Sequence, residues 1–457
     1  MPMPAGAENT WGLDEPGAGG RPLRFVTGGA HADWRAALSP QERDWAEVCR
    51  FEALGGQTLA LPDAAGGLAG AVGGLGDAED PLSYAHLPAS LPAARFAISE
   101  GLRPAVADAL ALGWALGAAG PLDRPASLVW PKDCQRERIA PLIAAEIDAR
   151  SWINAPPCEL GPGELADLAR AELAGQGAEV RVLSGKRLGE AGYPGLAHVG
   201  KGAARPPVLI DATWGPADAP RLTLVGKGVC FDAGGLNAKP YPDVLAMKAD
   251  MAGAAHALAL ARLVIGRRLP VRLRLLIAAA DNMPSGSAMM NGDLVRTACG
   301  QTIEVVHTDY EGRVMLADAL AAADAEAPDL LIDFSTLTDT GLGPDIAGVF
   351  TQDDALAEEL AAHAARLRDP VWRLPLWEGY AGQIRTPSGH LANREAGEAR
   401  IPSIAAALFL KRFVRQAGSW LHFDLEGWNA IACSPRPFGG NVVGLRATLA
   451  LLESRYG

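Results

Sequence analysis

Two kinds of apolar run alternate along the C-terminal two thirds of the chain. Short runs typical of β-strands are followed by longer stretches with helical spacing. Helices are predicted over 243–267 and 314–326. The alternation predicts an α/β domain in which helices flank both faces of a central, mostly parallel sheet, with functional side chains gathered where the strands end. The strand-like runs are LTLVG (222–226), VRLRLLIAAA (271–280), TIEVVHT (302–308) and DLLIDFSTL (329–337).

The N-terminal third has a different pattern. Up to about residue 150 the chain is rich in Gly, Ala and Pro, and its apolar runs are short, such as Leu59–Leu61. Helices are predicted around Pro104–Ala118 and Ile139–Arg150. This region contains no recognisable pattern of catalytic residues.

A change of composition marks the boundary between the two regions. The segment WINAPPCELGP (152–162) is rich in proline and polar residues and leads into a predicted helix over Pro162–Ala174. We therefore place a domain junction near residue 150. The sequence predicts a smaller α/β N-terminal domain over 1–150 and a larger domain over 151–457.

The composition is that of a soluble globular protein. Of the 457 residues, 49% are hydrophobic and 21% are charged, with a mean hydropathy of +0.08. The 53 acidic residues exceed the 41 Lys and Arg by 12, which disfavours attraction to nucleic acid or anionic membranes. The cysteines form no CxxC pair, so we expect free thiols in a reducing compartment and no cysteine-held structural zinc. The six are Cys49, Cys134, Cys158, Cys230, Cys299 and Cys433.

Neither a targeting segment nor a membrane span is expected. Residues 1–20 carry acids among Pro and Gly and lack the basic flank and apolar run of a secretory signal. The most apolar helical stretch, around Ala252–Ile265, is interrupted by His256 and Arg262 and is too short to cross a bilayer core of ~30 Å. We therefore expect a cytoplasmic protein without a membrane partner.

The first segment with candidate chemistry is VGKGVCFDAGGLNAKP, at 225–240. It follows an apolar strand and brings together Lys227, Asp232 and Lys239. A dinucleotide or phosphate loop is excluded, because the glycine spacing fails at residue 231 and no GK[ST] follows. The adjacent glycines after Asp232 allow the backbone to approach a ligand or metal closely. The alternative is an ordinary tight turn with surface lysines.

The second segment is MKAD, at 247–250, which opens a predicted helix. Met247 and Asp250 are three residues apart and so share a helix face. Taken alone, Asp250 is better explained as a first-turn acid that complements the helix dipole, and Met247 as a core residue.

The third segment is HTDYEGRVMLADAL, at 307–320, directly after the strand-like run TIEVV. In extended chain, residues two apart point the same way, so Asp309, Glu311 and Arg313 are expected to project to one side before the helix begins. Three charges on one side of a strand end are hard to explain as core. A solvated edge is the alternative.

If the three segments converge, they bring seven charged side chains to one sheet edge. Four carboxylates there would repel each other unless cations lie between them. Oxygen ligands without histidine or thiolate suit divalent ions such as Mn²⁺, Mg²⁺ or Zn²⁺, and carboxylates can bridge a pair. Two ions ~3.5–4 Å apart would bind hydroxide and polarise a carbonyl, as in two-metal hydrolysis. The carboxylates are Asp232, Asp250, Asp309 and Glu311, and the cations are Lys227, Lys239 and Arg313.

At these positions the chain resembles the leucine aminopeptidases, a family of cytosolic dinuclear metallo-exopeptidases. The central block NTDAEGR of that family stands here as HTDYEGR, at 307–313. The similarity runs from about Ser151 to the C-terminus, and the first 150 residues resemble the family's smaller domain only faintly. Five ordered blocks are far more specific than any single one. The other four blocks are VGKGVCFDAGG (225–235), MKADM (247–251), DNMPSG (281–286) and STLT (335–338), and the lysine before Pro240 matches as well.

The resemblance implies a ligand set for two divalent metal ions, Mn²⁺ or Zn²⁺. One ion would be held by Lys227, Asp232, Asp250 and Glu311. The other would be held by Asp232, Asp309 and Glu311, with the backbone carbonyl of Asp309. Two of these carboxylates would therefore bridge the ions.

The resemblance also implies two catalytic residues. Lys239 would polarise the scissile carbonyl and steady the tetrahedral intermediate, and Arg313 would anchor a bicarbonate ion that serves as general base. Arg313 lies at the start of a predicted helix, where the dipole and free N–H groups favour an anion. A peptide substrate's free α-amine would bind one metal, which restricts cleavage to the first residue. The family's assembly is a homohexamer with its active sites facing an inner cavity.

The substrate pocket departs from the family pattern. Met247, Thr336 and the backbone of Leu337 match positions that shape the pocket for the first side chain, and His307 stands where the family has Asn. We expect these four residues to contact the substrate.

Two further departures add polar groups beside this pocket. Tyr310 replaces Ala, and Asp339 stands where the family motif reads TLTG. A buried acid rejects apolar side chains unless it is paired or faces water, which argues against a preference for leucine.

Besides a metal-dependent aminopeptidase, two other hypotheses remain. A metal-dependent phosphohydrolase would use the same carboxylates with Lys227 and Lys239 holding the phosphate, but no nucleotide loop accompanies them. A regulatory binding protein on the same scaffold is the other, because some members of the family bind DNA through the smaller domain. The acidic charge balance argues against nucleic acid as a partner.

Overall fold

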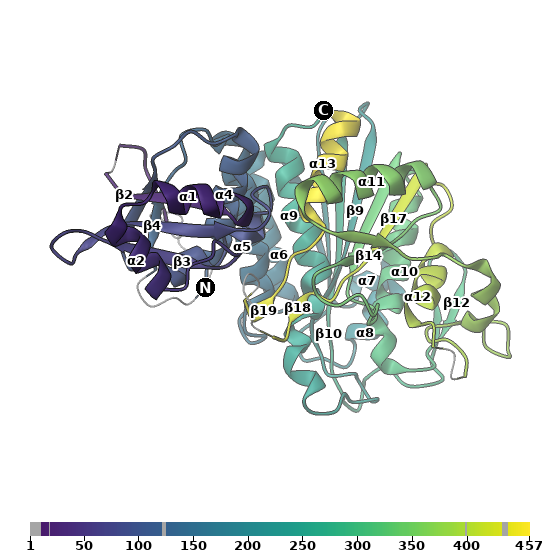
Figure 1. The fold of residues 1–457 in the computed structure, drawn as a ribbon. Helices are drawn as coiled ribbons and strands as arrows, with labels where there is room; N and C mark the ends of the chain where they lie inside the picture. Colours follow the sequence, from purple (N-terminus) through teal and green to yellow (C-terminus); the bar gives the residue numbers. More distant parts are fainter. Residues whose placement is uncertain (1–10, 18, 121–124, 398–399, 432–436) are drawn as a thin grey trace. The chain divides into compact units, whose positions relative to one another are not determined.

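The computed structural model describes residues 11–17, 19–120, 125–397, 400–431 and 437–457 (Figure 1). The chain forms two units. The first comprises residues 1–147 and 431–438, and the second comprises 148–430 and 439–457. Each unit contains its own sheet.

In the described part of the first unit, six strands form a sheet in the order β1-β6-β5-β2-β4-β3. All neighbouring pairs are parallel except β3 with β4. The strands are β1 (Leu13–Asp14), β2 (Arg21–Thr27), β3 (Thr58–Pro62), β4 (Leu68–Leu75), β5 (Arg95–Ile98) and β6 (Ser127–Val129). The helices are α1 (His31–Ala37), α2 (Pro40–Val48), α3 (Leu87–Ser90), α4 (Pro104–Ala118) and α5 (Arg136–Asn154), which continues into the second unit.

The predicted helix over Pro104–Ala118 is confirmed as α4. Proline stands in its first turn, where the missing N–H costs nothing, and Ala and Leu dominate its interior. The helix is buried nearly all round, with Trp114 fully inaccessible. A side chain at Gly113 would collide with the carbonyl oxygen of Pro81, so this position lets the chain pack directly against the helix.

In the second unit, eight described strands form a sheet in the order β15-β14-β17-β13-β9-β10-β8-β7. The four central strands β17, β13, β9 and β10 are parallel, while β14, β8 and β7 add antiparallel pairs toward the edges. The predicted mostly parallel sheet is confirmed. The strands are β7 (Glu179–Ser184), β8 (Val208–Trp214), β9 (Arg221–Asp232), β10 (Arg272–Asn282), β13 (Leu330–Ser335), β14 (Ala347–Phe350), β15 (Val371–Arg373) and β17 (Ser419–Asp424).

Helices cover both faces of this sheet. Val225 and Val229 of β9 belong to one buried cluster with residues of α8 and α10. Gly226 points the other way, because successive strand residues face opposite sides, and a side chain there would collide with Ala254 and Ala257 of α9. The helices of this unit are α6 (Pro162–Leu173), α7 (Arg187–Glu190), α8 (Pro194–Gly200), α9 (Ala252–Gly266), α10 (Glu311–Asp324), α11 (Asp354–Leu367), α12 (Pro402–Lys411) and α13 (Leu445–Tyr456).

The predicted strand over 302–308 is largely wrong. Only Thr302–Glu304 (β12) forms a strand, and it pairs with β11 (Leu294–Arg296) and β16 (Leu391–Ala392) in a separate sheet. The chain then enters a 3₁₀ turn, η5 (Thr308–Tyr310), and α10 begins at Glu311. The prediction that Asp309, Glu311 and Arg313 project from one extended segment is therefore wrong.

The predicted helix over 243–267 consists of two parts. Residues Asp243–Met251 form 3₁₀ helix (η4), and the α-helix α9 follows. This helical run is long and apolar enough to span a membrane, but nearly every residue of α9 is buried against the sheet, as in the core helix of a globular domain.

The cysteines of the described chain are free, as predicted: Cys49, Cys134, Cys158, Cys230 and Cys299. Cys433 lies outside the described residues.

Candidate metal centre

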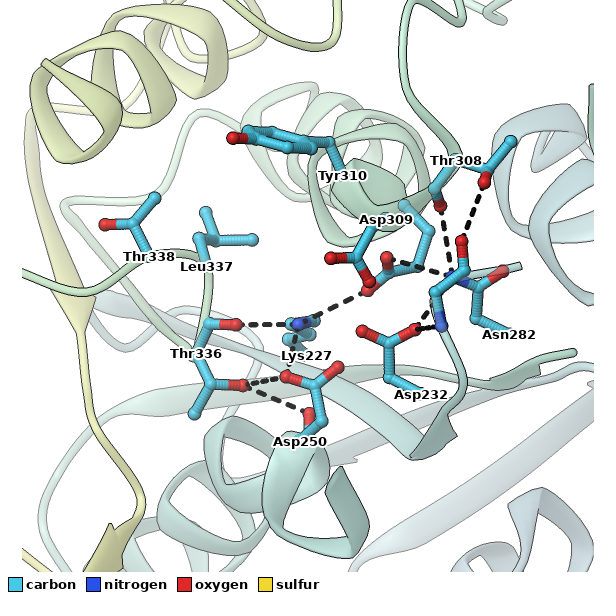
Figure 2. Close-up of polar contacts among 12 residues, drawn as sticks. Lys227, Asp232, Asp250, Asn282, Thr308, Asp309, Tyr310, Thr336, Leu337 and Thr338 are labelled. Carbon is cyan, nitrogen blue, oxygen red and sulfur yellow. Dashed lines mark hydrogen bonds and ion pairs between the residues drawn. The ribbon is translucent and has the colours of Figure 1, made fainter. Parts of the chain in front are cut away.

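Four neighbouring parallel strands end at one edge of the large sheet, and each ends in a polar residue. Figure 2 shows two of these residues, Asp232 and Asn282, in contact with each other. β10 ends at Asn282, β9 at Asp232, β13 at Ser335 and β17 at Asp424. The carboxyl ends of parallel strands share one edge, which is where α/β proteins bind ligands. The structure therefore brings residues from distant parts of the sequence into one centre.

Lys227 lies in the interior of β9, and a shorter neighbouring strand exposes it to the centre. Phe334 of β13 pairs with Gly226, and β13 ends one residue later, at the level of Lys227. The ammonium group therefore reaches past the end of β13, where its Nζ donates to the carbonyl oxygen of Thr336 at 2.7 Å. It also lies 2.6 Å from Oδ1 of Asp250. The side chain is only 3% exposed, so these interactions are shielded from water.

Asp232, the last residue of β9, is held by several donors. Its Oδ1 accepts from the backbone N–H of Gly234 and from Nδ2 of Asn282, both at 2.8 Å. Its Oδ2 lies 3.0 Å from Nζ of Lys239. The backbone of Gly234 has φ +87°, and a side chain there would come within 3.1 Å of Oδ1 of Asp309. Glycine is thus required for the close approach that the sequence predicted.

Asp309 and Glu311 reach the same place from the junction of η5 and α10. Thr308 fixes this junction, because its hydroxyl donates to the carbonyl oxygen of Gly234 at 2.7 Å. Oδ1 of Asp309 lies 2.6 Å from Nζ of Lys239, and Oε1 of Glu311 lies 3.5 Å from Nζ of Lys227. One oxygen from each of Asp232, Asp309 and Glu311 lies within 4.8 Å of the others.

Asp250 completes the set from the end of η4, immediately before α9. Its Oδ1 accepts from Nζ of Lys227 at 2.6 Å and from the hydroxyl of Thr336 at 2.7 Å. Its Oδ2 is buried and has no hydrogen-bond partner among the described residues. A buried carboxylate oxygen without a partner is costly, so this atom indicates a missing cationic ligand.

The crowded carboxylates have raised pKa values. Burial and the charge of Asp232 raise the pKa of Glu311 to about 8 and that of Asp309 to about 7. Burial raises the pKa of Asp250 to about 6, although Lys227 opposes the change. The positive charge of the lysines is therefore too small to keep all these acids ionised at neutral pH.

The two lysines have pKa values shifted in the opposite sense. Burial by itself lowers the pKa of Lys227, but Asp250 and Glu311 outweigh it and raise the pKa. The same balance, with Asp232 as the main charge, raises the pKa of Lys239. Without added cations, both lysines are ammonium ions.

These residues fit a divalent-metal site. The donor set consists of carboxylates, which hard and borderline divalent ions prefer. The unpartnered oxygen of Asp250 and the raised pKa values of Asp309 and Glu311 both indicate a deficit of positive charge. All five sequence-predicted ligands lie in this centre, whereas a solvated edge or a surface turn would leave them exposed.

Arg313 lies nearby but its guanidinium makes contacts of its own. Nη1 donates to the carbonyl oxygen of Asn393 at 2.8 Å and lies 3.3 Å from Oε2 of Glu395. Nη2 donates to the carbonyl oxygen of Pro402 at 3.1 Å. The guanidinium carbon lies 4.7 Å from the ring centroid of Tyr310, and Nε is buried without a hydrogen-bond partner in the described chain. The Nε–H group and one N–H of Nη2 therefore have no partner in the described chain and remain available to an anion.

The four predicted substrate-contacting residues are half-buried. Thr336 contacts Asp250 as described, and the side chain of Leu337 lies so near Gly312 that a Cβ there would be 2.6 Å from it. Nδ1 of His307 accepts from the backbone N–H of Asp309 at 3.2 Å. Met247 lies in η4, three residues before Asp250.

Asn282 is a residue of the centre to which the sequence assigned no role. Its Nδ2 contacts Oδ1 of Asp232 at 2.8 Å, the carbonyl oxygen of Thr308 at 3.0 Å and Oε2 of Glu311 at 3.1 Å. It therefore orients two of the carboxylates. Its place at the end of the strand-like run 271–280, inside the block DNMPSG, was the available signal.

Asp424 is a second residue without a predicted role. Its Oδ1 accepts from the backbone N–H of Leu337 at 2.8 Å and of Thr338 at 3.2 Å. It fixes the segment that follows β13, beside the centre. No motif drew attention to it, because its strand is the last of the central four and lies more than 80 residues from the others.

The chain is similar to proteins of one family over most of its length. The profile described as "Cytosol aminopeptidase family, catalytic domain" matches residues 148–447, and that of "M17 aminopeptidase, N-terminal domain" matches residues 21–121. A curated relative from Roseiflexus castenholzii, named probable cytosol aminopeptidase, is 38% identical over 316 residues. This alignment covers 67% of the chain and 64% of the relative, so the chain spans less than two thirds of that protein.

Two solved structures are similar along nearly the whole chain. The cytosol aminopeptidase from Coxiella burnetii matches with a TM-score of 0.92 and 36% identity, covering 98% of this chain and 100% of that one. The bottromycin maturation enzyme BotP in complex with Mn matches with a TM-score of 0.84 and 31% identity, covering 96% of this chain and 100% of that one.

Proposed function

Because the chain belongs to the cytosol aminopeptidase family, we propose that it is a metal-dependent aminopeptidase that removes the N-terminal residue of peptides. The observation that carries this proposal is the convergence of four carboxylates around a buried deficit of positive charge, at the carboxyl edge of the sheet. The sequence segments that form this edge contain no phosphate-binding loop, which favours a peptide over a nucleotide as the substrate.

The proposed ligands of two divalent ions are the residues of the centre. Asp232 and Glu311 would be shared by the two ions, Asp250 and Lys227 would belong to one ion, and Asp309 would belong to the other. When bound, the ions supply a Lewis acid for the scissile carbonyl and lower the pKa of water so that it serves as the nucleophile. Lys227 must lose its proton to act as a ligand, since an ammonium ion has no free electron pair.

Lys239 is proposed to donate to the oxygen of the scissile carbonyl. Its Nζ lies 3.0 Å from Asp232 and 2.6 Å from Asp309, and the side chain is only 16% exposed. The carboxylates raise its pKa, so it remains a cation at neutral pH. A fixed ammonium group in a site of low water content stabilises the negative charge that develops on the oxygen.

Arg313 is proposed to hold a bicarbonate ion as the base that takes a proton from the attacking water. The support is its buried Nε, which has no partner in the described residues, and its place in the first turn of α10. The ring of Tyr310 stacks on the guanidinium of Arg313, and Oε2 of Glu395 contacts its Nη1. These two contacts fix the orientation of the Arg313 side chain.

The remaining proposals concern the identity of the metal ions, the cellular location and the oligomeric state. We propose Mn²⁺ or Zn²⁺ as the ions, and the Mn complex of BotP supports the former. The name cytosol aminopeptidase, carried by similar proteins, supports a cytoplasmic location. A homohexamer follows from the family resemblance only, and sedimentation or mass photometry of the purified protein tests it.

The test is hydrolysis of a panel of aminoacyl fluorogenic amides by the full chain, with metal analysis of the same sample. We expect Mn²⁺- or Zn²⁺-dependent release of the first residue, no cleavage of N-acetylated substrates, and loss of activity on chelation. Activity that survives exhaustive chelation contradicts the proposal.

The same preparation separates the alternatives. Cleavage of phosphoesters without cleavage of amides would favour a phosphohydrolase. Salt-dependent retardation of DNA by the full chain, with no amide cleavage by metal-loaded protein, would favour a regulatory binding protein.

A further inference from the structure

Lys227 and Asp232, two ligands of the proposed metal centre, belong to the same strand, β9, and are five residues apart. Successive residues of a regular strand face opposite sides of the sheet, so an odd separation places two side chains on opposite faces. Both side chains nevertheless reach one centre. Nζ of Lys227 lies 3.5 Å from Oε1 of Glu311, and an oxygen of Asp232 lies within 4.8 Å of an oxygen of Glu311. The strand must therefore depart from regular alternation between these two ligands.

The departure is a β-bulge at Cys230. In the pairing of β9 with β10, Val229 lies opposite Ala280, but the next pair is Phe231 with Asp281. Cys230 is therefore an additional residue of β9 at this point. One additional residue shifts the alternation by one position, so the part of the strand beyond it faces the side opposite to that of a regular strand.

The contacts on the two faces of the sheet agree with this shift. Before the bulge, Val229 belongs to the buried cluster with α8 and α10, whereas a side chain at Gly228 would lie 3.3 Å from Leu165 of α6, on the other face. Beyond the bulge, Asp232 lies beside Glu311, the first residue of α10. The bulge thus moves this carboxylate from the α6 side of the sheet to the α10 side.

The residue opposite the bulge is anchored on the α6 side. Asp281 is only 3% exposed, and Arg205 contacts both of its oxygens, with Nε 2.7 Å from Oδ2 and Nη2 2.8 Å from Oδ1. Nη1 of Arg205 donates to the carbonyl oxygen of Pro157, and a side chain at Gly161, immediately before α6, would collide with the guanidinium. A bidentate pair fixes both the position and the orientation of the carboxylate. Arg205 therefore ties the end of β10 to the segment that begins α6.

This anchor acts on the metal centre through Asn282, the next residue of β10. Asn282 faces the opposite side from Asp281 and lies directly across from Asp232 in the strand register. Its Nδ2 contacts Oδ1 of Asp232 at 2.8 Å and Oε2 of Glu311 at 3.1 Å (Figure 2). A displacement of Asp281 would therefore move a donor that orients two proposed ligands, and it would also disturb the strand pairing that holds the bulge.

We propose that Asp281 and Arg205 are positioning residues of the metal centre, whose ion pair holds the end of β10 and the bulge in β9 so that Asn282 and Asp232 face the ions. This inference rests on the proposed aminopeptidase function and adds two residues that act from behind the ligands, on the α6 side of the sheet. A pair with a structural role alone would contribute to the free energy of unfolding and leave metal affinity unchanged. A positioning pair changes metal affinity in a protein that is still folded.

An ion pair of the same kind at the other end of β10 supplies the control. Arg274, near the start of the strand, contacts both oxygens of Asp211 of β8, with Nε 3.0 Å from Oδ1 and Nη2 2.8 Å from Oδ2. Asp211→Asn removes a carboxylate charge from this bidentate pair without touching the bulge or the metal centre. It is therefore the matched control for Asp281→Asn.

The first measurement is the affinity of the chelator-stripped full chain for Mn²⁺, by calorimetry. We expect Asp281→Asn to weaken Mn²⁺ binding by about tenfold or more, and Asp211→Asn to keep the wild-type affinity. Thermal unfolding of the metal-free variants shows whether each one is folded. Arg205→Lys keeps the charge but loses the bidentate geometry, so its affinity should be intermediate, and it provides the test if Asp281→Asn does not fold.

The second measurement is the visible absorption spectrum of the protein saturated with Co²⁺, which reports the geometry of the ligands and does not depend on turnover. The spectrum of Asp281→Asn should differ from that of the wild type, and the spectrum of Asp211→Asn should match it. Wild-type affinity and spectrum in folded Asp281→Asn and Arg205→Lys overturn the inference. Equal losses of affinity in Asp281→Asn and Asp211→Asn overturn it as well.

The failure of the proposed function has a different signature. A wild type that binds Mn²⁺ but cleaves no aminoacyl amide contradicts the aminopeptidase, while the affinities and Co²⁺ spectra of the variants still decide whether the ion pair positions the ligands. A wild type that binds neither Mn²⁺ nor Co²⁺ overturns both proposals.

Discussion

Two groups of acids in the same unit have opposite surroundings. In the metal centre, Asp232 and Asp250 each contact a lysine, and Asp232 accepts two further hydrogen bonds. Asp339 and Glu426, which follow β13 and β17, form no ion pair with Lys, Arg or His among the described residues, and burial together with the charge of Asp339 raises the pKa of Glu426 to about 7. Acids held in place by lysines and amides are organised to receive metal ions, whereas Asp339 accepts only a local hydrogen bond, from the backbone N–H of Gly341 at 2.7 Å.

The difference also concerns how much each group is fixed. Glu311 and Asp250 are buried among side chains from four structural elements, while Asp339 is exposed and Glu426 is half-buried. A buried ligand set loses little on metal binding because its geometry exists beforehand. We therefore expect substitutions in the metal centre to affect all substrates and those of Asp339 and Glu426 to affect only some.

The largest effect is expected for Glu311→Gln. Loss of a bridging charge should remove at least one metal ion and lower kcat by about 10³-fold, since a Lewis acid contributes several kcal/mol at the transition state. With its pKa at about 8, Glu311 is mostly protonated in the metal-free protein at pH 7, so Gln is a close mimic. The unfolding temperature of the metal-free variant should therefore stay near the wild-type value.

Metal analysis, initial rates and thermal unfolding check this prediction. Wild-type metal content and rate in Glu311→Gln would show that Glu311 is not a ligand. A large fall in the unfolding temperature of the metal-free variant would instead assign the loss of activity to misfolding.

The next effect is the pH dependence of metal binding. The raised pKa values of Asp250, Asp309 and Glu311, about 6, 7 and 8, mean that protons compete with the metal at low pH. Metal affinity should rise with pH between 6 and 8, by about tenfold per pH unit for each proton released. Calorimetric titration of Mn²⁺ into chelator-stripped protein, in buffers of different ionisation enthalpy, measures both affinity and proton release.

The same shifts predict the stability of the metal-free protein. The folded state of Glu311 binds a proton between its ordinary pKa of 4.5 and the raised value of about 8, while the unfolded state releases it. Its contribution to the free energy of unfolding is therefore lost as pH rises through this window. Saturating metal should reverse the trend, and a metal affinity independent of pH would refute the assigned shifts.

A smaller effect is expected for Asn282→Ala. The side-chain amide orients Asp232 and Glu311, and loss of such a partner typically weakens metal binding by about tenfold or more. The measurements for Asn282→Ala are metal affinity and kcat. The value of kcat should recover at high metal concentration. Asn291→Ala, an exposed asparagine of the same unit, is the matched control. Unchanged affinity in Asn282→Ala would make this residue a structural support only.

The smallest effect is expected for Asp339→Gly. Removal of one acid should shift the preferred first residue toward aliphatic side chains by several-fold, because one acidic group fewer would then border the predicted pocket. Asp339→Asn separates charge from volume, and an aminoacyl amide panel is the measurement. An unchanged profile in both variants would place Asp339 outside the pocket, while leaving the metal centre intact.

Local patterns were sufficient to predict several elements. The helix at Pro104–Ala118 matches α4, and the strand-like runs at 222–226 and 271–280 lie inside β9 and β10. Here the periodicity, the proline in the first turn and the apolar run agree. The prediction of a strand over 302–308 was largely wrong, although this sequence favours an extended chain. Pairing with β16 and the turn that Thr308 fixes limit the strand to three residues.

The ligand residues converge although one reason given for their convergence was wrong. Asp309 and Glu311 were expected to point the same way from a strand, yet they lie in a 3₁₀ turn and in the first turn of a helix. The turn places both carboxylates beside Asp232. The conclusion depended on charge and chemistry, which a change of local conformation leaves unaltered.

The amino-acid sequence by itself determined the alternation of strands and helices, the residue types of the ligands and their order in blocks, because these depend on local periodicity and on the chemistry of each side chain. Only the tertiary structure decided that Asn282 orients two carboxylates, that the guanidinium of Arg313 binds backbone carbonyls, and that Asp424 binds the backbone N–H groups of Leu337 and Thr338. Such contacts join positions up to almost 90 residues apart, and the register of neighbouring strands, set by packing across the whole sheet, selects them.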